Sequence, residues 1–449
     1  MISIKHRFLI LSLCIAMSIW LLIAQVFGSV LILIPCLVCF LVLVAWAGVQ
    51  GVSLPVLMFF LPFAPLLKFG QGSISFFTLA LLIVYLVYAV TGSRNIKIYH
   101  LIPALCIIVL TIIVKTMLGY SFDNSYILFS VALLLVPFVS RETDGKYDFY
   151  WITVFFVLGI TVAAITSQYL VLFPNIAGYI ETFDLFGAVR HAGYYGDPNF
   201  YSAHITVALA GIMVLSFSKL SKSKLVSLII MSAILLYCGL LSVSKSFVLI
   251  TICLFLMWLL ALMFHKGKIS GKITILFMTS IGIMFLLSST VFTDGINMVV
   301  ERFARDDNLS DFTTGRLDIW MNYMHEFESN LGLLLFGKGY SHVLVGGRAA
   351  HNTIIQIVFQ LGIIGSVFMV VWIVCLFHNF LQNTVLHREG VMPVLILMMG
   401  AFGPWLALDL MFFDEFFIVP MYVCIGIRYI LQKDLTVPIK TTRMVSKYE

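Results

Sequence analysis

Long apolar runs separated by short polar segments set the pattern of this chain. Hydropathy windows of span length along the 449 residues predict fourteen membrane-spanning helices. They lie at about 8–27, 29–49, 52–67, 74–91, 100–118, 125–140, 148–172, 200–218, 224–241, 246–264, 272–292, 352–378, 391–410 and 412–431. The third run is short and broken by Pro55, Pro62 and Pro65, which favours a re-entrant or tilted segment. We therefore expect an all-α, polytopic transmembrane bundle of 12–14 spans, with residues 1–449 forming a single transmembrane domain.

Two of the polar segments are too long to be simple turns. They cover about 173–199 and 293–351. Because loops between rigid elements often carry binding and catalytic groups, we expect these two loops to form the active-site region. We also expect the second loop to contain amphipathic helices at the membrane surface.

The composition agrees with a membrane protein. The chain is 61% hydrophobic and 11% charged, whereas soluble domains carry about 25% charged residues. With the N-terminus in the cytoplasm, 18 of the 27 lysines and arginines lie on the cytoplasmic side, as the positive-inside rule requires. Both termini are then cytoplasmic, both long loops are external, and the net charge of +6 gives no reason to expect a nucleic-acid partner.

The first long loop ends in a short motif of polar and charged residues. Asp197, Pro198 and Asn199 stand where a helix should begin, which favours capping over substrate binding for Asp197 and Asn199. Arg190 lies close by among glycines, and a cation near a helix N-terminus is suited to bind an anion. Lys245, in a tight external turn, is equally consistent with a phosphate ligand and with an interface anchor.

The second long loop contains a predicted amphipathic helix that starts after Thr313 or Thr314. Its apolar stripe is expected at Leu317, Trp320, Met321, Met324 and Phe327. Arg316 stands in the first turn, where a cation opposes the helix dipole. An unfavourable position of this kind favours a functional role, here the binding of a phosphate.

A histidine opens the span that follows this loop. On an uninterrupted helix Gly362 and Gly365 lie on the face beneath His351, which predicts a groove of small residues for a lipid tail or a close helix. His351 at the mouth of this groove could act as a base near neutral pH. The outer loops show no metal-ligand spacing, so we expect neither a metal nor another cofactor.

Three stretches in this order give the chain a resemblance to the superfamily of O-antigen ligases and O-antigen polymerases. They are Arg190 with Gly196-Asp197-Pro198-Asn199, then Thr314-Gly315-Arg316-Leu317-Asp318-Ile319-Trp320, then His351-Asn352 followed by Gly362-Ile363-Ile364-Gly365. The resemblance implies a GT-C-like, metal-independent glycosyltransferase of the bacterial inner membrane, with its active site in the periplasm. It further implies catalytic roles for Arg190, Arg316 and His351 and substrate contacts for Asn352. Where many members have Ser-Arg, this chain has Ser244-Lys245.

The resemblance also implies the partners. The substrate would be an undecaprenyl-pyrophosphate-linked oligosaccharide within the lipid bilayer, transferred to an acceptor hydroxyl. Polymerisation of O-antigen, capsule or exopolysaccharide repeat units, with a chain-length regulator as a further partner, is our first interpretation. Ligation of the glycan to lipid A-core uses the same motifs and stays open. A flippase or other transporter is the alternative from another class, although the chain shows neither an internal repeat nor charged midplane residues.

Overall fold

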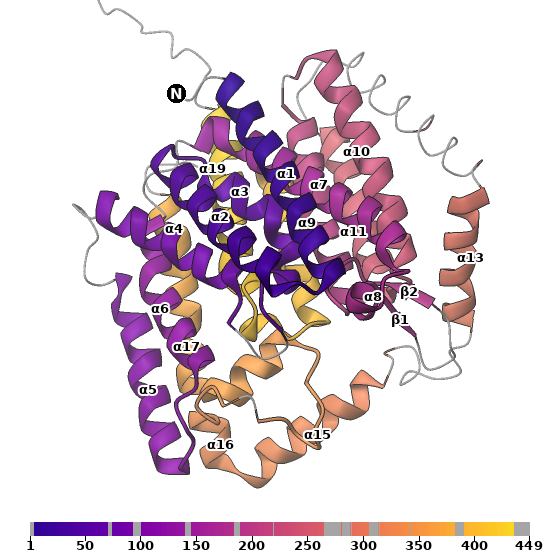
Figure 1. Ribbon diagram of the computed structural model, residues 1–449. Coiled ribbons are helices and arrows are strands. Elements are labelled where there is room, and N and C mark those ends of the chain that lie inside the picture. Colours follow the sequence, from indigo (N-terminus) through magenta and orange to yellow (C-terminus); the bar gives the residue numbers. More distant parts are fainter. Residues whose placement is uncertain are drawn as a thin grey trace, which may run out of the picture.

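A computed structural model shows how these segments fold. It describes residues 4–70, 74–92, 100–139, 145–183, 189–218, 220–264, 290–304, 315–341, 343–381 and 390–434, and the single residues 280, 288 and 313. Within these residues the protein is a bundle of helices with one very small sheet (Figure 1).

Seven of the described helices are long and apolar enough to cross a membrane. They belong to α1 (Ile4–Phe27), α2 (Val30–Val49), α7 (Gly145–Leu170), α9 (Pro198–Ser216), α10 (Lys222–Leu241), α11 (Lys245–Phe264) and α17 (Thr353–Leu381). In each, the helix pairs the backbone N–H and C=O groups internally, and the apolar side chains suit the hydrocarbon core of a bilayer. The prediction of a polytopic helical membrane protein is therefore confirmed.

Shorter helices occupy five other predicted apolar segments. They are α3 (Ser53–Phe60) with the 3-10 helix η1 (Leu61–Leu66), α4 (Phe76–Gly92), α5 (Ile102–Leu118), α6 (Asn124–Val139) and α18 (Val391–Phe402). Helix α19 (Glu415–Asp434) is longer but more polar. The predicted span 272–292 lies almost entirely outside the described residues. The full count of 12–14 spans stays a prediction.

The proline-broken segment forms the centre of the bundle. All eight residues of α3 are buried, and the helix tightens into η1, where Pro62 and Pro65 fall. Helix α7 crosses α3 at very short range: a Cβ on Gly159 would come within 2.1 Å of the carbonyl oxygen of Phe59. This close crossing leaves no room for lipid between the two helices.

Segments that the charge pattern assigns to the external side gather at one end of the bundle. The Asn175 amide donates to the Val26 carbonyl over 3.0 Å, and the Lys115 amine donates to the Tyr340 carbonyl over 3.0 Å. At the opposite end, Arg7 lies over the ring of Trp151 at 5.4 Å. These contacts agree with the predicted placement of the residues concerned, and we call the end that carries Asn175 and Tyr340 the outer end.

The outer end carries small elements of its own. They are α8 (Pro174–Ile180), the antiparallel strands β1 (Glu181–Phe183) and β2 (Val189–His191), α13 (Thr290–Ala304), α15 (Arg316–Ser329), α16 (Leu331–Phe336) and the 3-10 helices η5 (Gly403–Leu406) and η6 (Leu410–Phe412). Helices α15 and α16 lie below the bundle in Figure 1. The two-stranded sheet was not predicted.

Helix α15 forms where an amphipathic helix was predicted, but with a different buried face. Ile319, Tyr323 and Phe327 are buried and pack with Phe359 of α17. The predicted stripe was wrong for Met321, which is 50% exposed. Periodicity could not distinguish the two faces, because both carry apolar residues at helical spacing.

The helix also begins differently from the prediction. Its N-cap is Gly315, in the left-handed conformation with φ 72°, not a threonine. The Thr313 hydroxyl instead accepts a hydrogen bond from the Leu317 amide at 3.3 Å. Glycine tolerates this conformation without steric cost, so the chain can turn sharply into the helix.

Candidate functional site

Arg190 lies on strand β2, opposite Thr182 of β1. Its side chain crosses to two other elements and only 9% of the residue is exposed. Nε donates to the carbonyl of Ser242 at 3.2 Å, and a terminal nitrogen donates to Oδ1 of Asn199 at 3.3 Å. The guanidinium thereby connects the first outer loop to the turn between α10 and α11.

That turn receives a second arginine. Val243 has a positive φ of 47°, and its carbonyl accepts from the guanidinium of Arg302 on α13. Arg190 and Arg302 therefore bind the carbonyls of consecutive residues. Lys245 begins α11 two residues later, with its amine 5.6 Å from the ring centre of Phe303. Three cationic side chains thus meet at one tight turn.

Asp197 and Asn199 both make internal contacts. The Asp197 carboxylate accepts from the Asn199 amide at 2.7 Å and caps α9, so the capping interpretation is confirmed. Oδ1 of Asn199 also accepts from the Ser244 hydroxyl at 3.0 Å. The side chain of Asn199 is therefore a bridge between Arg190 and the turn.

Arg316 belongs to the same electrostatic neighbourhood. Burial lowers the pKa of its guanidinium, the nearby Asp197 and Asp409 carboxylates raise it, and Arg302 lowers it. A guanidinium keeps its proton under such shifts. Arg316 therefore places a fixed positive charge between carboxylates of the first outer loop and of the segment before α19.

His351 is held through its backbone. Oδ2 of Asp409 accepts from the His351 amide at 2.8 Å, and Oδ1 accepts from the Asn352 amide at 3.0 Å. His351 has φ 47°, a conformation that few residues other than glycine adopt. Burial raises the pKa of Asp409, while the two amides, His351 and Arg316 lower it. We call Arg190, Lys245, Arg302, Arg316, His351, Asp197 and Asp409 the cationic cluster.

Asn352 has a structural position. Its Oδ1 accepts from the amides of Ile354 and Ile355 at 3.0 and 3.2 Å, which caps α17. The next residue, Thr353, donates to the Leu408 carbonyl. These contacts fix the helix start beneath His351 and occupy the side chain that the motif assigns to substrate.

Of the two predicted uses of Gly362 and Gly365, a lipid tail or a close helix, the structure shows close helix packing. Gly362 has φ 67° and ψ 179°, so α17 is kinked there and the angular spacing of a regular helix does not apply across it. A Cβ on Gly362 would lie 2.3 Å from the carbonyl oxygen of Leu335 in α16. A Cβ on Gly365 would meet Leu110 of α5 at 3.1 Å. Both glycines permit close packing of protein on protein.

Next to the kink, α17 binds the turn that follows α16. The carbonyls of Phe359 and Gln360, just before the kink, accept from the amides of Lys338 and Gly339 at 3.0 and 2.8 Å. The glycine-rich turn after α16 is thereby fastened to α17. The glycines thus hold the second outer loop close to the bundle.

Three acidic residues at and before the start of α19, Asp409, Asp414 and Glu415, have partners from other elements. Asp409 binds the two amides already described. Oδ2 of Asp414 accepts from the Thr78 hydroxyl at 3.0 Å. Oε1 of Glu415 contacts Nε2 of His204 at 2.9 Å and accepts from the Tyr195 hydroxyl at 2.7 Å. These partners are far away in sequence, so spacing could not reveal them.

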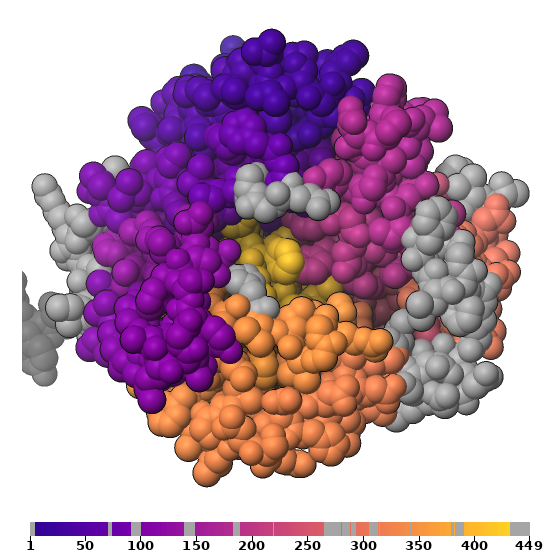
Figure 2. All heavy atoms as spheres, turned by 60° about the horizontal axis from the view of Figure 1, so that its bottom comes forward, coloured from indigo at the N-terminus to yellow at the C-terminus, as the bar shows by residue number. Residues whose placement is uncertain are grey.

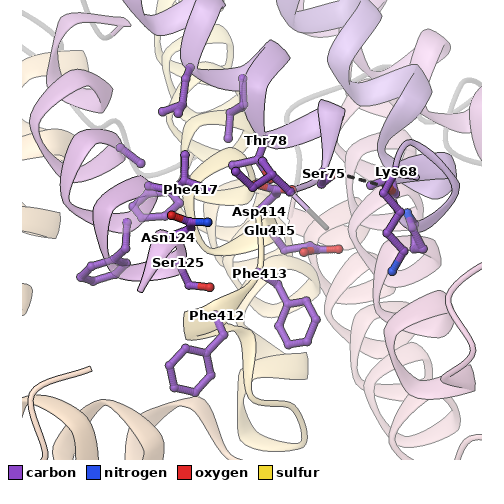
Figure 3. A pocket seen from close by; sticks show the side chains of 18 of the residues that line it. Lys68, Ser75, Thr78, Asn124, Ser125, Phe412, Phe413, Asp414, Glu415 and Phe417 are labelled. Atoms are coloured by element: carbon purple, nitrogen blue, oxygen red, sulfur yellow. Dashed lines mark hydrogen bonds between the residues drawn. The ribbon is translucent and has the colours of Figure 1, made fainter. Parts of the chain in front are cut away.

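A pocket of about 370 Å³ lies beside the cationic cluster. Its walls come from η1, α4, α6 and the segment 411–417, and Figure 3 shows Asp414 and Asn124 among the side chains around it. Figure 2, which brings the outer end forward, shows a hollow with C-terminal residues at its depth. Sequence reasoning missed both this pocket and Arg302. Arg302 could have been found as a charged residue on the amphipathic helix α13.

Chemically, the cationic cluster is suited to an anion. Besides His351, it contains four cationic side chains and two carboxylates. Buried arginines stabilise negative charge strongly. Within the described ranges, no group of three or more His, Cys, Asp and Glu residues is arranged to hold a metal ion.

Comparison with known proteins does not identify a family. No family model matches this sequence, and no curated protein matches it either.

Proposed function

We propose that the protein is a membrane glycosyltransferase that moves a polyprenyl-pyrophosphate-linked glycan onto an acceptor hydroxyl at the outer face of the bilayer. The proposal rests on the polytopic helical fold together with the chemistry of the cationic cluster. Its first form is polymerisation of repeat units. Ligation to a lipid acceptor differs in the acceptor and uses the same residues.

One observation carries this proposal. Arg190 and Arg302 come from separate segments and bind neighbouring carbonyls of one turn. Arg316, from a third segment, interacts electrostatically with Arg302 and with the carboxylates of Asp197 and Asp409. When a sugar leaves a pyrophosphate carrier, negative charge builds on the leaving oxygen. Fixed guanidinium groups can stabilise this charge without reorganising at the moment of reaction.

His351 supplies the second element of the proposal. Its amide is fixed by the Asp409 carboxylate at 2.8 Å, and among the described residues no hydrogen bond is made by its imidazole. The ring is therefore open to an acceptor hydroxyl. In the proposed reaction it takes the hydroxyl proton while the oxygen attacks the sugar carbon and the carrier pyrophosphate leaves.

A matched pair of arginines tests the proposal in cells. Arg316 is in the cationic cluster, whereas Arg348, in the same outer loop, is exposed and bonds to other described residues through its backbone. In a host that lacks its own copy, Arg316→Ala should abolish the surface glycan and let the lipid-linked substrate accumulate. Arg348→Ala should keep both at wild-type levels, as glycan gels and quantified lipid-linked oligosaccharide would show.

Two outcomes of this pair of variants would count against the proposed function. Normal glycan from Arg316→Ala, at equal protein level in the membrane, would contradict the proposed function. Equal losses from both variants would show that the loop needs its charges only for folding.

A further inference from the structure

The pocket beside the cationic cluster has its own chemistry. Its aromatic walls include Tyr179, Tyr195, Phe412 and Phe413, and polar groups from α4, α6 and the start of α19 stand between them. Figure 3 shows Asn124 and Ser125 from α6 with Thr78 and Asp414 around a common space. Its volume of about 370 Å³ falls within the range of small-molecule sites, about 300–1,000 Å³.

Several polar groups of the pocket have hydrogen-bonding capacity that other described residues do not use. Among the described residues, no hydrogen bond is made by the amide of Asn124 or the hydroxyl of Ser125. Thr78 occupies one oxygen of Asp414, so the other can bind a ligand. Burial, and then the neighbouring Glu415 carboxylate, raise the pKa of Asp414 to about 7. The group can therefore donate or accept a hydrogen bond near neutral pH.

Two classes of ligand suit this pocket poorly. A hydrocarbon tail would remove water from the second oxygen of Asp414 and from the amide of Asn124 without offering either a hydrogen bond, which is costly. A phosphate would meet the carboxylates of Asp414 and Glu415, against a single cation among the lining residues, Lys68. Lys68 is itself partly buried, which lowers its pKa. The pocket therefore favours a polar molecule without negative charge that also has apolar faces.

The pocket and the cationic cluster share two segments of the chain. Residues 409–415 carry Asp409 of the cluster and Asp414 of the pocket, and the loop 190–200 carries Arg190 and Tyr195. Rings of Phe200 and Phe413 join these segments, with their centres 4.6 Å apart. A molecule in the pocket would thus lie next to the residues that position the cluster.

We propose that this pocket is a carbohydrate subsite, which holds a neutral or amino-bearing sugar ring and discriminates against acidic sugars. Sugar hydroxyls donate to and accept from Asp414, Asn124 and Ser125, while the C–H faces of the ring pack on the aromatic walls. The assignment of this subsite to the acceptor glycan rests on the proposed function. The proposal that the pocket binds a sugar rests only on the lining of the pocket.

Saturation-transfer NMR on the purified full chain tests the subsite. The probes are N-acetylglucosamine, galactosamine and glucuronic acid. At least one of the first two should bind, and glucuronic acid should bind at least about tenfold more weakly. Asn124→Leu and Asp414→Asn should each weaken binding about three- to tenfold, as expected for a lost hydrogen bond. Asn322→Leu, on the exposed face of α15, is the matched control and should bind like wild type.

Several results would overturn the subsite. These are the absence of binding by both neutral and amino sugars, equal affinity for glucuronic acid, or unchanged binding in both pocket variants. Because Asn124 is exposed at a helix start, its replacement should leave the thermal unfolding temperature unchanged. Sugar binding that depends on Asn124 in a protein without transferase activity would sink the proposed function and keep the subsite. Conversely, transferase activity in a protein whose pocket variants bind sugar and react like wild type would contradict the subsite and keep the proposed function.

Discussion

The cationic cluster and the neighbouring pocket are built in opposite ways. The cluster consists of charged side chains held by short polar contacts, such as Arg190 to Ser242 and Asp409 to the His351 amide. The pocket consists mainly of aromatic and polar side chains, with the carboxylates of Asp414 and Glu415 among them, and the packing of η1, α4, α6 and the segment 411–417 gives it its shape. The first arrangement is suited to charge stabilisation, and the second to binding by shape and hydrogen bonds. Under the proposed function, the difference would separate charge stabilisation from sugar recognition in two neighbouring regions of the protein.

The largest expected effect separates the two regions. His351→Asn should slow transfer by about 10²–10⁴, the typical loss for a missing general base. Asn also tolerates a positive φ, so the backbone at 351 should keep its conformation. Gel analysis should show shortened or absent polymer and accumulated lipid-linked substrate, while sugar binding in the pocket stays unchanged. Wild-type polymer from this variant would show that His351 is not the base and that the site acts only through its charges.

Asp409 stands on the segment that both regions share, and its loss should weaken their common support. In Asp409→Ala the amides of His351 and Asn352 lose their acceptor. Each such buried donor costs about 1–3 kcal/mol when it is left unpaired. Thermal unfolding in detergent should show the loss, and Asp409→Asn, which can accept one of the two bonds, should lose less. A variant as stable as wild type would show that Asp409 does not hold the segment.

The smallest effect concerns the hairpin next to the cluster. His191 is buried on β2, with Nε2 2.9 Å from the Ser167 hydroxyl, and burial lowers its pKa to about 4. The unfolded chain takes up a proton near pH 6.5 while the folded chain does not. The contribution of His191 to the free energy of unfolding is therefore fully present above about pH 6.5 and is lost as the pH falls towards 4.

Between pH 7 and pH 5.5 this difference amounts to about 1 kcal/mol. His191→Gln removes the titration and keeps a side chain able to bond Ser167, so its unfolding temperature should depend less on pH than that of wild type. Identical pH profiles for the two proteins would mean that His191 is not buried in solution as it is in the structure.

Sequence reasoning predicted the seven candidate spans and two arginines of the cationic cluster for a simple physical reason. In a chain this apolar, an arginine in a long polar loop is conspicuous, so Arg190 and Arg316 were identified from their positions alone. The capping role of Asp197 followed from local rules at a helix start.

The remainder depended on packing. The glycine spacing after His351 was interpreted on a regular helix, but the kink at Gly362 redirects α17 and seats α16 against it. The pocket could not be predicted because Asn124, Thr78 and Asp414 are ordinary in their local contexts. They become a site only when α6, α4 and the start of α19 meet.

The central claim is that the cationic cluster, and not the pocket, stabilises the leaving pyrophosphate. The most direct test measures release of polyprenyl pyrophosphate from a lipid-linked oligosaccharide by the purified protein in liposomes. Arg316→Ala should lower the rate by about 10²–10³, as for other lost charge-stabilising donors. Arg316→Lys should recover part of it, because a point charge cannot make the paired bonds of a guanidinium. Arg348→Ala should match wild type. Undiminished release from Arg316→Ala would contradict the account.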